Sequence, residues 1–355
     1  MDGERVPVVG VETALPAELQ RAIERESGAT AAQEEPAPVL DARSAPVLVT
    51  GAAGLVGTHV CRELTKRGWA VRALVRDQNK ALRRLGHLQV DLVVGDIRDA
   101  DDLDRVLRGA GAVVHLAAIA IEGSGQRYEA VNAEATERLL AAAARANVER
   151  FVHMSQNGAS SASPYRFLRS KGVAEDSVRG SRRRWTILRP SVIFGPQDEF
   201  VNVLARLVRL TPVLFPLPDG GRARFQPIAA GDIALVIAQI LEKPETIGES
   251  YALGGPAALT LRQMAERIFL AMHVRRRVVS VPIGLLAPLV ALLQRVLPHP
   301  PVTTSLLELL SVDNTVPGSA LSETFGISPT PFAPEEIRWL RDITVRDALR
   351  SIFRR

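Results

Sequence analysis

Apolar and polar positions change their pattern at residue 46. Beyond it, short apolar runs of strand length alternate with longer segments in which apolar residues recur at helical spacing. The runs predict strands at 46–50, 70–75, 89–94, 112–116, 150–154 and 184–189, and the segments between them predict helices at 55–67, 100–108, 129–146 and 163–179. Such alternation is typical of a parallel β-sheet covered on both faces by helices. The sequence therefore predicts an α/β fold with a doubly wound parallel sheet.

The alternation loosens after about residue 195. Prolines and glycines crowd residues 212–227, and further helices are predicted at about 230–242 and 260–272. Open α/β sheets bind ligands at the carboxyl ends of their strands. We therefore expect the later part of the chain to cover that edge of the sheet.

These patterns divide the chain into three parts. Residues 1–43 carry nine acidic residues against four arginines, a net charge of −5 (four minus nine), and predict a flexible acidic N-terminal extension. Residues 44–195 are expected to form a dinucleotide-binding core. Residues 196–355 are expected to form a smaller C-terminal α+β lobe that serves a substrate or a partner, with 228–255 returning to the core.

An uncharged stretch rich in leucine and valine covers residues 278–294. It is shorter than the about 20 apolar residues of a transmembrane helix, and prolines and a glycine interrupt it, so no transmembrane segment is predicted. Its apolar residues at helical spacing are expected on one face: Leu285, Leu286, Leu289, Leu292, Leu293 and Val296. Two interpretations stay open: a buried or lid helix, or a helix at 283–297 that lies on a membrane surface or a partner subunit.

A glycine-rich loop follows the first predicted strand. Val47-Leu48-Val49-Thr50 leads into Gly51-Ala52-Ala53-Gly54-Leu55-Val56-Gly57, where a helix is predicted to begin at Leu55. A strand, a Gly-x-x-Gly-x-x-Gly loop and a helix in this order predict a site for the pyrophosphate of a dinucleotide, because the helix N-terminus presents N–H groups and partial positive charge. The sequence thus predicts a Rossmann-type fold whose cofactor contacts Gly51, Ala53, Gly54, Leu55, Val56 and Gly57.

The composition limits the other classes of function. Apolar residues make up 46% and charged residues 23% of the chain, as in an ordinary soluble protein. The one cysteine, Cys61, excludes an internal disulfide and fits a reducing compartment, and no signal peptide is recognised. We expect a cytoplasmic protein, with peripheral attachment at the inner face of the membrane as the alternative. The basic residues are spread thinly along the chain and do not lie in aromatic-rich stretches that could stack on bases, so no nucleic-acid partner is expected. No metal-ligand spacing occurs in the sequence, so no metal is expected.

Further motifs resemble those of the extended and atypical short-chain dehydrogenase/reductases over about 46–255. Besides the glycine loop, the matching segments are Gly95-Asp96-Ile97 after the third strand, His115-Leu116-Ala117-Ala118 at the end of the fourth, Asn132 in a helix, and Arg189-Pro190-Ser191-Val192-Ile193-Phe194-Gly195. The resemblance implies that Asp96 and Ile97 lie by the adenine and that Ala117 and Ala118 lie beneath the cofactor. It also implies that Pro190 and Val192 lie near the nicotinamide.

The end of the second strand bears on the choice of dinucleotide. Relatives that prefer NAD carry an acidic residue there to bind the ribose hydroxyls. Here the position is Val75, followed by Arg76, whose guanidinium can pair with a 2′-phosphate. Asp77 next to it argues weakly the other way. The sequence favours NADP(H), with NAD(H) as the alternative.

The family's catalytic pair is incomplete in this chain. Family enzymes use a tyrosine and, four residues later, a lysine on one helix, so that both side chains share a face. Lys171 matches the lysine, and only four of the 44 basic residues are lysines (Lys66, Lys80, Lys171 and Lys243). The residue four positions earlier is Phe167, which has no proton to give. Tyr165 is a doubtful replacement, since on a continuous helix it lies about 240° from the lysine, and it could take part only if the helix starts late and the loop bends back. Ser155 is the candidate for the family's substrate-orienting serine, with Gln156 as the alternative residue that faces the site.

A closer resemblance fits the missing tyrosine. The chain resembles the short-chain-dehydrogenase-like accessory subunits of respiratory complex I and their bacterial relatives over roughly 46–345. The matching runs include Phe167-Leu168-Arg169-Ser170-Lys171, Ile193-Phe194-Gly195-Pro196 with Asp198 and Phe200, Phe225-Gln226-Pro227 with Asp232, and Leu309-Leu310-Ser311-Val312-Asp313-Asn314. This resemblance implies NADPH that is held tightly without evident turnover, with a respiratory-complex subunit as partner.

Two functional hypotheses therefore remain. In the first, the protein holds NADP(H) as a structural or sensing ligand. In the second, it is an active NAD(P)-dependent oxidoreductase, or an enzyme of the sugar-nucleotide epimerase/dehydratase type, that acts on a small-molecule substrate with a non-standard proton donor.

Overall fold

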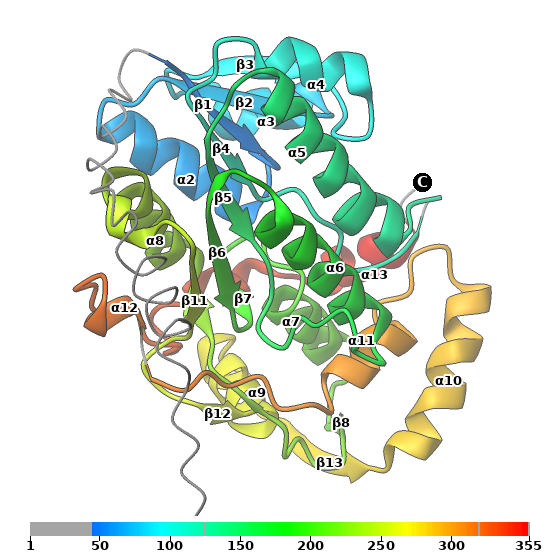
Figure 1. Cartoon of the computed structure of the whole chain (residues 1–355). Coiled ribbons are helices and arrows are strands. Elements are labelled where there is room, and N and C mark those ends of the chain that lie inside the picture. The colour runs from blue at the N-terminus through cyan, green and yellow to red at the C-terminus, as the bar shows by residue number, and fades with distance from the viewer. Residues whose placement is uncertain (1–44, 124, 319, 354–355) are drawn as a thin grey trace, which may run out of the picture. The chain divides into compact units, whose positions relative to one another are not determined.

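Seven parallel strands form the central sheet (Figure 1), which we describe from a computed structural model for residues 45–123, 125–318 and 320–353. The strand order is β11-β6-β5-β4-β1-β2-β3. These strands are β1 (Val47–Thr50), β2 (Val71–Val75), β3 (Asp91–Val94), β4 (Ala112–His115), β5 (Arg150–Met154), β6 (Arg184–Pro190) and β11 (Glu249–Leu253). From β1 the chain builds outward first on one side and then on the other, which confirms the predicted doubly wound parallel sheet. The predicted extension 1–43 lies outside the described residues.

Helices cover both faces of the sheet. One layer holds α2 (Leu55–Lys66), α3 (Gln78–Leu85) and α8 (Ala230–Glu242), and the other holds α4 (Ala100–Leu107), α5 (Ala135–Arg145) and α6 (Arg166–Gly180). The strands supply both layers because their side chains alternate between faces: Val47 and Val49 belong to the first core, and Leu48 to the second. A strand buried on both faces must be apolar throughout, which accounts for the continuous apolar runs in the sequence.

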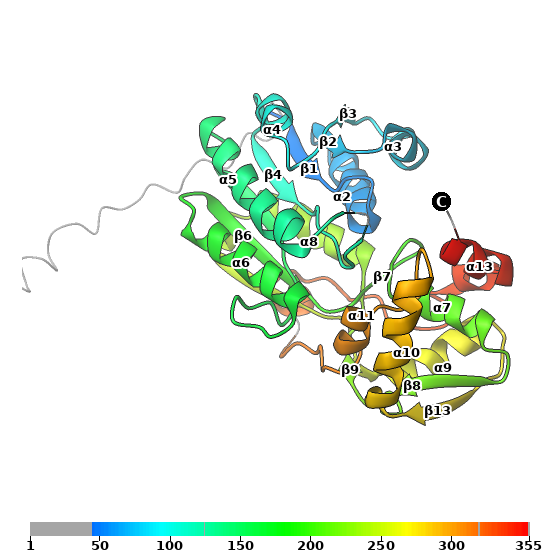
Figure 2. The same cartoon turned by 90° about the vertical axis from the view of Figure 1, so that its right-hand side faces the viewer.

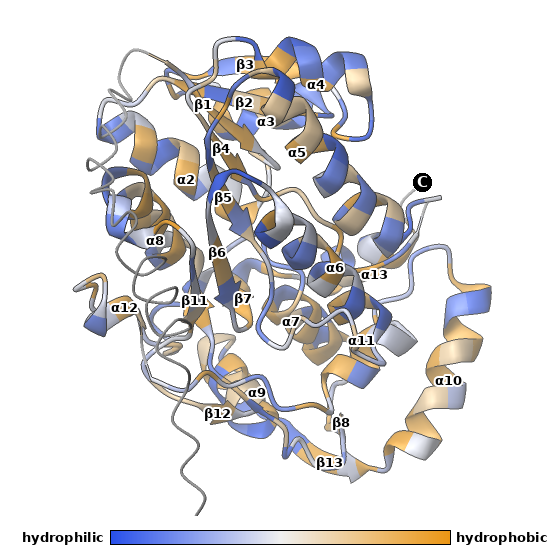
Figure 3. Cartoon of the chain, in the orientation of Figure 1, coloured by the Kyte–Doolittle hydropathy of each residue, from blue (hydrophilic) through white to orange (hydrophobic). Residues whose placement is uncertain are grey.

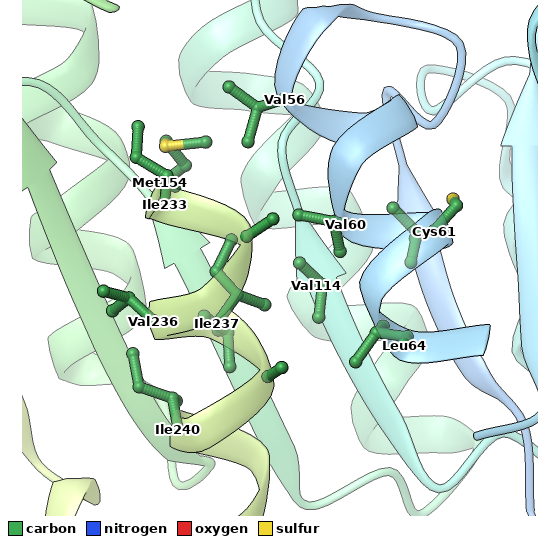
Figure 4. Packing of buried hydrophobic residues seen from close by; sticks show 14 of the residues in the cluster. Val56, Val60, Cys61, Leu64, Val114, Met154, Ile233, Val236, Ile237 and Ile240 are labelled. Atoms are coloured by element: carbon green, nitrogen blue, oxygen red, sulfur yellow. The ribbon is translucent and has the colours of Figure 1, made fainter. Parts of the chain in front are cut away.

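The packing between α2 and α8 closes the first layer (Figure 4). Val60 and Leu64 of α2 face Ile237 of α8 above Val114 of β4, and all four side chains are fully buried. Burial of a side chain of this size contributes roughly 1.5–3 kcal/mol. This layer fixes where α2 begins at the carboxyl end of β1.

Several helices differ from the sequence prediction. The helix α3 was not predicted, because it is mostly polar and buries only Ala81 and Leu85. The predicted helix at 129–146 begins as a π-helix, η1 (Glu129–Glu134), and continues as α5. The helix predicted from 163 begins only at Arg166, after an extended Tyr165. Pro164 disfavours helical backbone only at Ser163 before it, so the later start at Arg166 follows from the extended backbone of Tyr165 itself (φ −81°, ψ 118°).

The C-terminal region packs around a core of its own. It contains α7 (Val201–Leu210), α9 (Leu261–Ala271), α10 (Ile283–Val296), α11 (Thr304–Leu309), α13 (Val345–Phe353) and the short helix η3 (Arg338–Asp342). The helix α12 (Ala320–Glu323) instead packs beside β11, and η2 (Pro244–Thr246) beside α8. Three strand pairs complete the region: β7 (Ile193–Phe194) with β10 (Ile228–Ala229), β9 (Arg224–Phe225) with β12 (Leu259–Thr260), and β8 (Leu214–Pro218) with β13 (Arg277–Val281). This smaller α+β region agrees with the predicted fold class. The division of the chain at residue 195 stays a prediction, because the described residues on both sides of it belong to one compact unit.

The apolar segment 278–294 is largely on the surface, contrary to a buried helix. Its first residues form β13, and the rest form α10, which lies at the edge of the C-terminal region (Figures 1 and 2). Of the residues expected on one face, Leu286 and Leu293 are half-buried, whereas the other four are exposed: Leu285, Leu289, Leu292 and Val296. Within the described ranges, none of the helices is both long and apolar enough to cross a membrane.

Candidate functional site

Two adjoining cavities of about 640 Å³ each lie at the carboxyl ends of the parallel strands. We call the first the β3 cavity, since it is lined by Val75, Arg76 and Asp96 among others. The second is the α6 cavity, lined among others by Ser155, Phe167 and Lys171. Both cavities share the glycine loop and the segment that follows β4. The site therefore lies where ligands bind in open α/β folds.

The glycine loop leaves room for a ligand at one position only. Gly51 has a φ of +67°, and a Cβ there would lie 2.9 Å from the backbone nitrogen of Ala117. A Cβ on Gly57 would lie 2.3 Å from the Gly51 carbonyl oxygen, so neither glycine tolerates a side chain. A Cβ on Gly54 would approach only the Gly51 carbonyl oxygen, at 3.0 Å, and this glycine lines both cavities. The loop is thus a cradle with its open side at Gly54.

The start of α2 is suited to an anion. The helix begins at Leu55, and no side chain caps its N-terminus. Its first-turn N–H groups and the positive end of its dipole therefore face the cavities. A phosphate or pyrophosphate group fits this position.

Cations gather in the β3 cavity. Arg76, Lys80 and Arg98 line it, and the Arg98 guanidinium donates to both carboxylate oxygens of Asp96, from Nε to Oδ1 at 3.0 Å and from Nη2 to Oδ2 at 2.6 Å. The hydrogen bonds from Arg98 lower the pKa of Asp96, which keeps this carboxyl ionised. Asp77 caps α3 by accepting a hydrogen bond from the Lys80 backbone N–H at 2.9 Å. Its carboxylate therefore has a role in starting the helix, which the sequence did not reveal.

A chain of buried hydrogen bonds links the end of β1 to α6. Thr50 Oγ1 lies 2.7 Å from His115 Nδ1, and His115 Nε2 lies 2.9 Å from Thr136 Oγ1. Because Thr136 donates its proton to the Asn132 carbonyl, it accepts from Nε2–H, which leaves Nδ1 to accept from Thr50. Asn132 Nδ2 in turn donates to Ser170 Oγ at 3.1 Å. Burial lowers the pKa of His115 to about 3, so the imidazole is neutral.

Asn132 also fixes the segment between the two cavities. Its Oδ1 accepts from the Ile119 N–H at 2.9 Å, and its Nδ2 donates to the Ile119 carbonyl at 3.1 Å. Asn132 lies in the π-helix η1, and local π-helical turns are frequent at functional sites. The predicted family asparagine therefore holds residues 116–121, which line both cavities.

Lys171 lies at the inner wall of the α6 cavity. Its Nζ donates to the Met154 carbonyl at 2.6 Å, and only 3% of the residue is exposed. Burial lowers the pKa of Lys171 to about 8, although Glu175 opposes this shift. The ammonium is thus held at the end of β5 in a form that can donate further hydrogen bonds into the cavity.

Phe167 and Tyr165 both line the α6 cavity, but only Phe167 belongs to α6. The Phe167 ring centroid lies 5.6 Å from that of Tyr128, whose hydroxyl donates to the Ala120 carbonyl at 2.9 Å. Tyr165 precedes the helix, so the angle of about 240° expected for a continuous helix does not apply to it. The late start is one of the conditions under which Tyr165 could take part, and Tyr165 lines the cavity; its role stays a prediction.

Ser155 has a buried hydroxyl that is open to a ligand. It lines the α6 cavity, is 4% exposed, and its Oγ has no hydrogen-bond partner within the described part of the chain. Buried polar groups almost always have partners. An oxygen or nitrogen of a bound molecule in the α6 cavity fits the unpaired Ser155 Oγ.

The structure brings nearly all of the sequence-predicted residues to these two cavities. Those that line one or both are Gly51, Ala53, Gly54, Leu55, Val56, Gly57, Arg76, Asp96, Ile97, Ala117, Ala118, Ser155, Tyr165, Lys171 and Val192. Pro190 lines neither: it is buried, and its carbonyl accepts from the Asn157 N–H at 2.9 Å. Their roles in binding stay predictions.

Sequence reasoning missed several lining residues. Lys80 lines both cavities, and the rarity of lysine could have indicated it, as it did Lys171. No comparable signal marks Arg98. The same holds for Leu306 and Leu309 of α11, because only the fold brings this helix to the site. No group of three or more histidine, cysteine or acidic side chains is placed to hold a metal ion among the residues described here.

Comparison with known proteins identifies the family. A protein-family model described as NAD(P)H-binding matches residues 51–244. The chain therefore belongs to the NAD(P)H-binding family, with the fold of the extended short-chain dehydrogenase/reductases.

Its relatives include proteins of mitochondria and bacteria. The chain is 32% identical to the Arabidopsis thaliana NADH dehydrogenase [ubiquinone] 1 alpha subcomplex subunit 9, over 66% of this chain and 60% of that protein. It is 30% identical to the Mus musculus subunit of the same name, over 82% and 79%. A ceramide reductase of Caulobacter vibrioides is 36% identical over 51% of this chain and 56% of that protein.

A solved structure shows the same fold. The dTDP-glucose 4,6-dehydratase of Streptomyces venezuelae, with NAD bound, superposes with a TM-score of 0.65 at 22% identity, over 84% of this chain and 97% of that one. This likeness supports the seven-stranded parallel sheet with a smaller C-terminal region.

A side chain at Gly54 should block the dinucleotide and leave the fold intact. We expect Gly54→Val to weaken NADPH binding by more than about tenfold, since the branched side chain enters the open side of the cradle. Fluorescence titration with NADPH and thermal unfolding measure the two effects. Gly180→Val is the matched control, because nothing lies within 4 Å of a Cβ there. A folded Gly54→Val protein with unchanged affinity would contradict the assigned phosphate position.

Lys171 should make stability depend on pH. Its pKa is about 8 in the folded protein against an ordinary value of 10.5, so between these values the unfolded chain binds more protons. The free energy of unfolding therefore rises with pH in this window. From pH 8 to pH 10 the wild type should gain about 2 kcal/mol relative to Lys171→Met.

Urea unfolding of the cofactor-free proteins at both pH values tests this expectation. Lys66→Met serves as the control, since Lys66 is exposed on α2 and should give no such change. A difference between wild type and Lys171→Met that stays constant with pH would show that Lys171 is not desolvated.

Proposed function

We propose that the protein holds NADP(H) as a structural or sensing ligand, with Phe167 in place of the family's proton donor. The observation that carries the proposal is the α6 cavity, in which Lys171 is present while the residue one helical turn earlier has no ionisable group. The glycine cradle and the uncapped start of α2 support binding of the pyrophosphate. The bound dinucleotide would supply hydride chemistry.

The charges of the β3 cavity support a preference for NADP(H) over NAD(H). Arg76, Lys80 and Arg98 provide three cations where a 2′-phosphate would lie, and Val75 ends β2 without a carboxylate. Asp77, the nearest acid, already accepts a hydrogen bond within α3. A guanidinium binds a phosphate with paired hydrogen bonds that a neutral ribose hydroxyl cannot replace.

The chain's own residues then bind and orient the ligand without a positioned acid. Lys171 would donate to the nicotinamide ribose from the end of β5, and Ser155 would bond to a ligand oxygen. Phe167 offers an apolar wall. By analogy with the relatives named as subunits of NADH dehydrogenase, we further propose a subunit of a respiratory assembly as the partner.

A second candidate function is an active NAD(P)-dependent oxidoreductase. The specific observation in its favour is Tyr165, whose side chain lines the same cavity as Ser155 and Lys171 from just outside α6. The Caulobacter relative is named as a reductase. In this alternative Tyr165 donates the proton that Phe167 cannot.

Exchange of the two aromatic residues separates the alternatives. General acid catalysis is typically worth 10²–10⁴-fold. If the protein only holds its ligand, wild type should oxidise bound NADPH negligibly with simple carbonyl compounds, and Phe167→Tyr should raise the rate without changing NADPH affinity. Stopped-flow absorbance of NADPH follows the rate. Robust turnover by the wild type that is abolished in Tyr165→Phe would establish the second candidate.

Arg76 should determine the choice of dinucleotide. A charge-assisted hydrogen bond to phosphate contributes roughly 1.5–3 kcal/mol. We expect Arg76→Ala to weaken NADPH selectively by about tenfold or more and to leave NADH nearly unchanged, as calorimetric titration can measure. Arg83→Ala, an exposed residue of α3 outside both cavities, is the control. Equal losses for both nucleotides would assign Arg76 no part in the selection.

A further inference from the structure

The part of the α6 cavity wall formed after residue 191 has no positive charge. In the described residues, the cations that line this cavity are Lys80 and Arg84 of α3 and Lys171 of α6. The later residues instead supply three acids, Asp198, Glu199 and Asp313. Positive charge is therefore confined to the side of the cavity that the dinucleotide would occupy.

This distribution disfavours a sugar nucleotide as the second ligand. A nucleoside diphosphate needs cations or several N–H donors for its phosphates. Asp198 is buried and accepts backbone N–H groups of its own loop, so the carboxylates that such a ligand would meet on this wall are Glu199 and Asp313. Their repulsion would add to the cost of desolvating the phosphates. The α6 cavity of this chain is therefore suited to an uncharged molecule.

The same wall is apolar. Phe200, Phe225, Leu306, Leu309 and Val312 line it, and the rings of Phe200 and Phe225 lie 5.6 Å apart between centroids. Apolar surface of this kind gains free energy when it contacts a hydrocarbon chain instead of water. At the inner end of the cavity, the unpaired hydroxyl of Ser155 can bond to a polar head group.

An exposed apolar stripe lies next to this wall. The helix α11 contributes Leu306 and Leu309 to the wall, and α10 packs against α11, where the Thr304 N–H donates to Gln294 Oε1 at 2.9 Å. On the outer face of α10, four residues on one side of the helix are 67%, 52%, 58% and 70% exposed: Leu285, Leu289, Leu292 and Val296. Figures 2 and 3 show this apolar helix beside α11.

The charges around the stripe indicate what covers it. From Arg267 to Leu307 the chain contains no acidic residue, and its basic residues are arginines at 267, 275, 276, 277 and 295. An apolar helix face within a purely cationic segment is complementary to an anionic lipid surface, where the apolar side chains enter the acyl boundary and the arginines contact head groups.

We propose that the α6 cavity binds the uncharged head of a long-chain amphiphile, a ketone or an alcohol, taken from a membrane on which α10 lies. The head would bond to Ser155, and the chain would lie along the wall formed by Phe200 before α7, by β9 and by α11. The proposal rests on the proposed function, in that NADPH occupies the other side of the cavity. It replaces the sugar-nucleotide class as the expected second ligand.

Binding of soluble probes tests the cavity. The NADPH-loaded full-length protein is titrated with methyl ketones of increasing chain length and, separately, with UDP-glucose, while the fluorescence of bound NADPH reports occupation. Ketone affinity should rise up to about fourfold per added methylene, and UDP-glucose should give no response. Binding of UDP-glucose, or ketone affinity that does not depend on chain length, would overturn the proposal. Failure of the wild type to retain NADPH would instead contradict the proposed function.

Variants locate the site. Leu309→Glu and Val312→Glu place a charge on the half-buried apolar wall and should each weaken ketone binding at least about tenfold, with NADPH retained. Two variants are used so that the site can still be located if one of them fails to fold. Leu292→Glu, on the exposed face of α10, is the matched control and should leave ketone affinity unchanged. Ketone binding unaffected by both wall variants would overturn the assigned site.

Vesicles test the source of the amphiphile. Wild type should sediment with phosphatidylglycerol vesicles and much less with phosphatidylcholine vesicles, and Leu292→Glu should reduce this association several-fold. Added salt should weaken it, because the arginine contacts are electrostatic. No association with phosphatidylglycerol vesicles, or association that Leu292→Glu does not change, would overturn the membrane as the source.

Discussion

A neutral histidine held between two threonines determines the geometry of the whole site. His115 has one ring nitrogen that donates and one that accepts, and both partners are fixed: Thr136 must accept, and Thr50 must donate. Thr50 Oγ1 also accepts from the backbone N–H groups of Leu116 and Ala117, each at 3.2 Å. The Thr50 hydroxyl therefore donates its own proton to the imidazole. If His115 were protonated, its Nδ1–H and the Thr50 hydroxyl proton would both lie between Nδ1 and Thr50 Oγ1. The imidazolium charge would also lie near the ammonium of Lys171. One protonation state therefore sets the end of β1, the segment after β4 and the π-helix together.

The two cavities differ in charge in a way that follows from the fold. The helix α3 and the turn after β3 bring cations to the edge strands of the sheet, whereas α11 and the segment after it bring apolar side chains and Asp313 to the α6 cavity. The chain around residue 200 contributes to both cavities, with Glu199 in each and Arg206 in the β3 cavity. In our proposal, NADPH would lie with its phosphates toward the cations and its uncharged reduced ring toward the α6 cavity, whose far wall would then be left for a second, uncharged ligand.

The sequence predicted local features and missed those that depend on distant contacts. The glycine loop could be predicted because strand, glycine spacing and helix are adjacent, and Lys171 because lysine is rare. Asp77 could be interpreted only as a neighbour of Arg76, and its role as the cap of α3 was missed because α3 was not predicted. The two faces of α10 could not be separated, since helical spacing does not show which side α11 covers. The place of Tyr165 depended on where α6 begins, which the sequence pattern did not show.

Lys171 is the residue that most strongly connects the structure with the proposed binding role. A lysine that is 3% exposed loses most of its hydration, and burial lowers its pKa to about 8 against the opposing charge of Glu175. An ammonium has three protons to donate, and the hydrogen bond that the structure describes uses one of them, to the Met154 carbonyl. The hydroxyl oxygens of a bound ribose would accept the remaining ammonium protons. These hydrogen bonds would offset the hydration that Lys171 loses on burial. Phe167 offers nothing comparable to this ammonium. The contrast between this ammonium and the apolar ring one helical turn earlier is the physical basis of our proposal that the protein holds its ligand.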